Sequence, residues 1–118
     1  MQIEIPKPFK EKRPWGEELW ITHNAPTMVK ILTVFPKELL SLQYHHKRDE
    51  YWRVLSGNGK AIIGTETIEL KEGDDCFVPR ETKHRLIGGS ENLVLLELAF
   101  GVFEEADIVR LEDNYGRM

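Results

Sequence analysis

Short segments in which apolar and polar residues alternate, separated by turn residues, make up most of the chain. The clearest is residues 28–35, MVKILTVF, which is rich in β-branched side chains and is followed by Pro36. Such runs favour strands, because branched side chains pack well on a pleated surface and proline ends the ladder. The expected strands are residues 17–22, 28–35, 39–45, 50–55, 60–64, 65–70, 76–79, 84–87 and 92–100. About eight or more short strands at 8–12-residue spacing are typical of an antiparallel sandwich or barrel.

The two ends of the chain lack this alternation. Residues 1–12 are charged and interrupted by two prolines, which predicts an extended arm with at most a short strand at residues 2–5. Trp15, in the turn after this arm, is expected to plug one end of the barrel. A C-terminal extension, residues 103–118, is predicted to begin with one helical turn over residues 103–108. We therefore expect one domain over the whole chain, with an arm before the barrel and an extension after it.

Composition sets the broad class of protein. A chain of 118 residues is long enough for one domain with a core, and 41% apolar with 31% charged residues is usual for a soluble globular protein. The net charge of −4 argues against nucleic acid as a partner. No segment approaches the ~20 apolar residues of a membrane span, and residues 1–12 lack a signal-peptide core. Because Cys76 is the single cysteine, no internal disulfide can form, and we expect a cytoplasmic protein with no membrane partner.

Four side chains with nitrogen or oxygen donors fall in two segments. Gln43 and His45 lie on one face of the strand at residues 39–45, about 7 Å apart. Glu50 follows after a polar turn, and a hairpin here would fold it back towards His45. His84 comes from the second segment, GDDCFVPRETKH. Such a donor set suits a divalent zinc, manganese, iron, cobalt or nickel ion. The alternative is that Gln43, His45 and His46 are solvated residues at the end of a hairpin.

These two segments resemble the paired motifs of the cupin family. The first motif, G-x5-H-x-H-x4-E-x6-G, corresponds to residues 37–57, with Gln43 in place of the first histidine. The second, G-x5-P-x-G-x2-H, corresponds to residues 73–84. Among cupins the chain is most similar to the type II phosphomannose isomerase module, and RPWG (13–16) and DIVRLEDNYGR (107–117) agree with it. That module also forms the C-terminal half of bifunctional mannose-1-phosphate guanylyltransferases.

The resemblance implies a fold, an activity and a cofactor. The implied fold is all-β, a cupin double-stranded β-helix, which is a jelly-roll-like antiparallel barrel. The implied activity is that of a mannose-6-phosphate isomerase, which interconverts mannose-6-phosphate and fructose-6-phosphate through an enediolate. One divalent metal ion, with zinc favoured, would be held by Gln43, His45, Glu50 and His84. The expected partners are a small sugar phosphate and, because a small cupin leaves apolar sheet edges and faces, a second copy of the chain.

Further roles follow from the same resemblance. Arg48 is expected to stabilise the enediolate or to clamp phosphate, although a solvated turn residue is the alternative. Glu97 is a candidate for the proton-transferring base or for a group that orients a metal ligand. His46 is a third catalytic candidate, but strand alternation would turn it away from the ligands. Arg13, by the resemblance, and Arg80, because it lies close to His84 in the sequence, are the expected substrate-binding residues.

Several positions depart from the family pattern. Lys37 and Glu81 stand where cupins usually have glycine, and each would cost roughly 1 kcal/mol if its turn requires a positive φ. Ala99 and Phe100 stand where the subfamily usually has polar residues. They keep open a sugar-binding cupin without turnover. A small metal-dependent cupin oxygenase is the other alternative, although Gln43 in place of a histidine argues against it.

Overall fold

The computed structural model describes residues 8–102, 104–113 and 115–116, in which the regular elements are strands apart from one 3-10 turn. The elements are β1 (Phe9–Arg13), β2 (Gly16–Trp20), β3 (Thr27–Val34), β4 (Leu42–His45), β5 (Arg48–Ser56), β6 (Asn58–Ile63), β7 (Glu66–Lys71), β8 (Asp75–Val78), β9 (His84–Gly88), β10 (Leu93–Gly101), η1 (Glu105–Asp107) and β11 (Ile108–Glu112). No helix within this described part has the length and apolar character of a membrane span.

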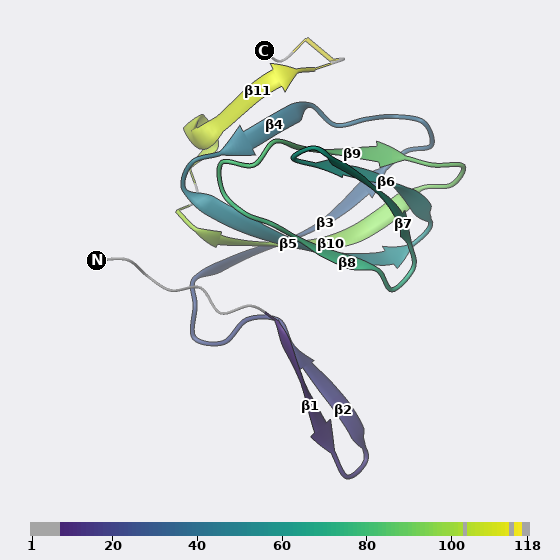
Figure 1. Cartoon of the computed structure of the whole chain (residues 1–118), viewed down its shortest axis with the longest axis vertical. Helices are drawn as coiled ribbons and strands as arrows, with labels where there is room; N and C mark the ends of the chain where they lie inside the picture. Colours follow the sequence, from purple (N-terminus) through teal and green to yellow (C-terminus); the bar gives the residue numbers. More distant parts are fainter. Residues whose placement is uncertain (1–7, 103, 114, 117–118) are drawn as a thin grey trace.

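Two antiparallel sheets face each other and enclose the core (Figure 1). The four-stranded sheet has the order β3-β10-β5-β8, and the five-stranded sheet has the order β11-β4-β9-β6-β7. Strand alternation sends Val54 and Leu95 inward from the first sheet and Ala61 and Leu86 inward from the second, each at most 3% exposed. The predicted all-β, jelly-roll-like barrel is therefore confirmed.

The predicted hairpin between the first metal-binding segment and Glu50 is wrong. β4 pairs with β9 and β11, whereas β5 pairs with β10 and β8, so the chain crosses from one sheet to the other between them. The crossing is a tight bend at His46 and Lys47, whose backbone N–H groups donate to the Asp107 carboxylate at 3.0 and 2.9 Å. His45 and Glu50 therefore face each other across the barrel interior rather than along a hairpin.

Two strands were not predicted from the sequence. β1, FKEKR, was expected to belong to an extended arm, but it pairs with β2 in a hairpin that projects away from the barrel (Figure 1). Trp15 lies in the turn of this hairpin and is 74% exposed, so it does not plug the barrel. β11 pairs with β4 at the edge of the five-stranded sheet. The helical turn expected near residue 105 is present as η1, and the strand expected at residues 2–5 lies outside the described residues.

Lys37 and Glu81 adopt the left-handed backbone conformation that their motifs usually give to glycine, with φ of 64° and 63°. Replacing Lys37 with glycine should relieve this strain, although glycine also adds freedom to the unfolded chain. We expect Lys37→Gly to raise the free energy of unfolding by up to about 1 kcal/mol in urea denaturation. Lys60→Gly, inside β6, is the matched control and should lower it by about 0.5–1 kcal/mol. A Lys37→Gly variant that is destabilised as much as Lys60→Gly would show that the turn does not store this strain.

Candidate metal centre

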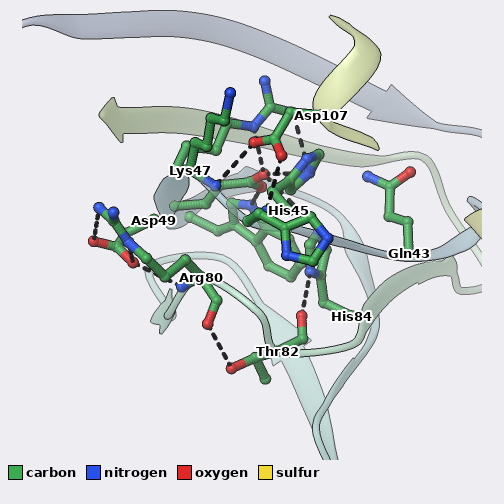
Figure 2. A network of polar contacts seen from close by, with 12 residues as sticks. Gln43, His45, Lys47, Asp49, Arg80, Thr82, His84 and Asp107 are labelled. Atoms are coloured by element: carbon green, nitrogen blue, oxygen red, sulfur yellow. Dashed lines mark hydrogen bonds and ion pairs between the residues drawn. The ribbon is translucent and has the colours of Figure 1, made fainter. Parts of the chain in front are cut away.

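Three buried donor side chains converge inside the barrel. His45 ends β4, Glu50 lies in β5 and His84 begins β9, and their exposed fractions are 2%, 1% and 3%. Glu50 Oε2 lies 3.1 Å from His45 Nε2 and 3.9 Å from His84 Nε2. One donor atom from each residue lies within 4.8 Å of the other two. The two imidazoles lie side by side in Figure 2, so donors from both sheets meet at one point.

Hydrogen bonds on the far side of His84 and Glu50 orient these two side chains towards the centre. His84 Nδ1 donates to the Thr82 carbonyl oxygen at 2.9 Å, which leaves the Nε2 lone pair directed into the cluster. That Nε2 is buried and has no hydrogen-bond partner. Glu50 Oε1 accepts from Trp52 Nε1 at 2.9 Å, so Oε2 is the oxygen that faces the imidazoles. A divalent cation would satisfy these buried atoms, and the residues present therefore fit such an ion.

Gln43 lies beside this cluster but is engaged elsewhere. It pairs in register with His84 across β4 and β9, and its amide oxygen accepts a hydrogen bond from Ser41 Oγ at 2.7 Å. Gln43, Glu50 and His84 line one small cavity of about 30 Å³, together with Glu97. That volume exceeds the roughly 10–15 Å³ needed to hold one water, so the cavity has room for an ion or a water. Because an amide oxygen has two lone pairs, Gln43 could keep its bond with Ser41 and still ligate an ion.

Arg48 is buried against the donor atoms and is not a solvated turn residue. It is 8% exposed, with Nη2 3.1 Å from His45 Nε2 and Nε 3.5 Å from Glu50 Oε2. Arginine suits a buried position next to a carboxylate better than lysine does, because the guanidinium stays charged and its planar donors can bind an anion in pairs. Arg48 therefore supplies a fixed positive charge at the centre.

Glu97, on β10, forms a carboxyl pair with Glu50 and is 8% exposed. Burial raises the pKa of Glu97 to about 8, and the hydrogen bond and charge of Glu50 add to this effect. Burial also acts to raise the pKa of Glu50, but hydrogen bonds with His45 and Glu97 outweigh it and lower that pKa. Two carboxyl groups in contact hold one proton between them, and in this pair Glu97 is the protonated member.

The structure does not bring three of the predicted site residues to the centre. His46 is exposed and packs edge-on against Tyr44, with ring centroids 5.2 Å apart. Arg80 forms an ion pair with Asp49 at 3.2 Å, and its side chain is 43% exposed. Arg13 lies in the projecting hairpin, where it pairs with two glutamates of the same hairpin. Arg13 and Arg80 therefore contact acidic neighbours, and His46 contacts an aromatic one, instead of the donor side chains of the centre.

The structure also adds residues that sequence analysis did not select. Asp107 is 6% exposed, and it fixes the bend that follows His45 (Figure 2). Burial acts to raise the pKa of Asp107, but the hydrogen bonds from the two backbone N–H groups act against it, and the pKa lies below its usual value. Lys30, on β3, pairs in register with Glu97, and its exposed side chain carries a positive charge that acts on that carboxyl group. The only signal in the sequence was that Asp107 begins the C-terminal segment of the family resemblance.

Comparisons with known proteins agree with this fold. A family model described as "Mannose-6-phosphate isomerase C-terminal" matches residues 4–113. The xanthan biosynthesis protein XanB of Xanthomonas campestris is 42% identical over 110 residues, which are 92% of this chain and 24% of that protein. The mannose-1-phosphate guanylyltransferase ManC of Salmonella typhimurium is 40% identical over 108 residues, 90% of this chain and 22% of that protein. The chain thus spans about a quarter of the length of these curated relatives.

Among solved structures, one of oxalate decarboxylase from Bacillus subtilis, described for its Mn(II) centres, aligns with a TM-score of 0.63 and 26% identity. The alignment covers 72% of this chain and 24% of that one. The barrel and its buried cluster of two histidines and a glutamate define a cupin with a candidate metal centre. The chain belongs to the mannose-6-phosphate isomerase C-terminal family, and is thus a cupin domain of the sugar-phosphate isomerase type.

Proposed function

We propose that this chain interconverts mannose-6-phosphate and fructose-6-phosphate in a metal-dependent reaction through an enediolate. The observation that carries the proposal is the donor set of His45, Glu50 and His84, buried beside the Arg48 guanidinium and the Glu97 carboxyl group. Membership of the family supports the same activity. Guanylyl transfer, named for several relatives, is no part of the proposal because the chain covers only about a quarter of their length.

The proposed cofactor is one divalent ion held by His45, Glu50 and His84, with Gln43 as a fourth ligand. When bound, the ion would supply Lewis-acid stabilisation of negative charge on the substrate oxygens. Two imidazoles and a carboxylate suit zinc, manganese, cobalt, nickel and iron alike, and zinc remains the ion that we propose. Manganese is the ion named for the oxalate decarboxylase structure.

The protein groups at the centre divide the remaining work. Arg48 holds a permanent positive charge next to Glu50, where it can stabilise the anionic enediolate. Glu97 lines the small cavity with Glu50, and its raised pKa of about 8 means that only its ionised form, the minor one at neutral pH, can take the proton from C2 and return it to C1 of the sugar. Because this cavity measures only about 30 Å³, the rest of the substrate must bind at its rim.

Ala99 and Phe100, which kept the non-catalytic alternative open, occupy different faces of β10. Phe100 is 1% exposed and packs with Tyr51 and Leu98 in a cluster separate from the main core. Ala99 pairs in register with Glu50 and lies on the face that meets the centre. Of the two positions where the subfamily usually has a polar residue, only Ala99 therefore lies where such a residue could reach the centre.

A coupled assay with mannose-6-phosphate tests the proposal and separates the three classes of function. The metal-loaded chain should form fructose-6-phosphate, lose this activity with a chelator, and regain it when the metal is restored. A sugar-binding cupin would bind mannose-6-phosphate without forming product. An oxygenase would consume oxygen with a suitable substrate and would leave the sugar phosphate unchanged.

We also propose that the chain forms a homodimer. β3 is an edge strand, and on its outer face Val29 and Ile31 are 58% and 65% exposed. Exposed apolar edge strands are normally covered, because they otherwise promote aggregation. We expect sedimentation to give a dimer at tens of micromolar, roughly the useful range for weak dimers. A monomer across that range would contradict this prediction.

A further inference from the structure

Arg110 lies in line with the candidate metal ligands, on a strand that sequence analysis did not predict. It pairs in register with Gln43 across β11 and β4, and Gln43 pairs with His84 across β4 and β9. Directly opposite residues of paired antiparallel strands point to the same face of the sheet. Arg110, Gln43 and His84 therefore form one row on the inner face. At about 4.8 Å per strand, the Cα atoms at its ends are roughly 10 Å apart.

The Arg110 guanidinium has no partner among the residues that the structure describes. Its Nε is buried and makes no hydrogen bond, and no described carboxylate lies within 4.0 Å of it. Arg110 as a whole is half-buried, but its buried Nε without an acceptor is still unfavourable and requires an explanation. β11 is an edge strand, so Arg110 is the outermost residue of the row that it forms with Gln43 and His84, at the rim of the barrel.

The other arginines near the centre already have partners. Arg48 contacts His45 and Glu50, as described above. Arg85 donates from Nε to the Leu40 carbonyl oxygen at 2.7 Å. Arg80 pairs with Asp49. Within the described chain, Arg110 is thus the arginine of this neighbourhood whose positive charge remains available.

We infer that Arg110 binds the phosphate group of the substrate. The inference rests on the proposed function and extends it to a residue outside the predicted set. A phosphate monoester has a charge near −2 and three acceptor oxygens, which suit the paired donors of a guanidinium. The phosphate on C6 lies far along the sugar from C1 and C2. A binding group one strand beyond Gln43 is therefore where a sugar whose first two carbons lie at the metal ligands would place it.

Calorimetric titration with inorganic phosphate tests Arg110 directly. The full chain is titrated in its metal-loaded form and again after metal removal, because phosphate also binds to metal ions. Arg110→Ala should weaken phosphate binding to the metal-free chain by about 10- to 100-fold, as expected for one charge-assisted contact. In the isomerase assay the same variant should raise KM for mannose-6-phosphate more than it lowers kcat. Arg53→Ala removes an arginine of β5 that pairs with Asp75 of β8, and it should change neither the affinity for phosphate nor KM.

The outcomes separate this inference from the proposed function. If wild type binds no phosphate, if Arg110→Ala binds it normally, or if only Lys30→Ala weakens it, the inference is wrong. If Arg110→Ala does not fold, Arg110→Lys decides: it should keep the charge but weaken phosphate binding through loss of the paired donors. Phosphate binding that depends on Arg110, without isomerase turnover in wild type, would support the subsite and contradict the proposed reaction. Turnover in wild type, with an unchanged KM in Arg110→Ala, would support the proposed reaction and contradict the phosphate subsite.

Discussion

His84→Ala should lose most of its bound metal while the barrel stays folded. His84 supplies a buried nitrogen whose tautomer is fixed by the Thr82 carbonyl, and its removal leaves His45 and Glu50 as the close pair of donors. Loss of a group that merely orients a ligand costs 10–100-fold in metal affinity, so loss of the ligand itself should cost on the order of 100-fold or more. Competition with a chromogenic chelator measures that affinity, and elemental analysis after dialysis measures the metal content.

His46→Ala is the matched control for this experiment. His46 neighbours a proposed ligand in the sequence, but its exposed ring packs against Tyr44 and points away from the centre. This variant should keep stoichiometric metal. Because His84 packs edge-on against Trp52, thermal denaturation of both metal-free variants must show that each is folded. Stoichiometric metal in folded His84→Ala would mean that the ligand assignment is wrong.

Arg48→Ala should lose turnover and keep its metal. The guanidinium lies next to Glu50 Oε2 and His45 Nε2, and it is almost fully buried, so no solvent charge replaces it. Losing one charge-assisted contact to the enediolate should cost about 2–4 kcal/mol of transition-state stabilisation, or about 30- to 1,000-fold in kcat. Steady-state kinetics and elemental analysis on the same preparation measure the two quantities.

Two further arginine variants show whether the geometry of Arg48 matters. Arg48→Lys keeps a charge but loses the paired planar donors, so its kcat should fall between those of wild type and Arg48→Ala. Arg53→Ala, an equal change on the same strand at the ion pair with Asp75, should leave kcat unchanged. Turnover near wild type in Arg48→Ala would show that the guanidinium has no part in the reaction.

The strands that the sequence predicts best are those with one buried face. The range 28–35 was expected from its apolar pattern, and β3 occupies Thr27–Val34 because alternate side chains enter the core. β1 escaped prediction because it is charged and exposed on both faces, so no core imposes a pattern on it. β11 has five residues, none fully buried, and its pairing partner is more than sixty residues earlier in the chain.

The candidate site was predicted as a set of residues but not as a geometry. Motif spacing brought His45, Glu50 and His84 together, yet the polar bend between the first two carries no signal for a crossing between sheets rather than a hairpin. Contacts that depend on the register of distant strands, such as Arg110 beside Gln43, cannot be read from local spacing. The acidic partners that hold Arg13 and Arg80 away from the centre likewise carry no signal in the local spacing, and substrate binding by these two residues stays a prediction.

The most direct test of a metal-dependent isomerase is NMR spectroscopy of mannose-6-phosphate incubated with this chain in D2O. The metal-loaded protein should produce fructose-6-phosphate. Starting instead from fructose-6-phosphate, it should form mannose-6-phosphate with some deuterium at C2, because a proton carried by a protein carboxyl group exchanges with solvent. The chelated protein should produce neither change. If protein with one bound ion per chain forms no product with zinc, manganese, cobalt, nickel or iron, the proposed function is contradicted.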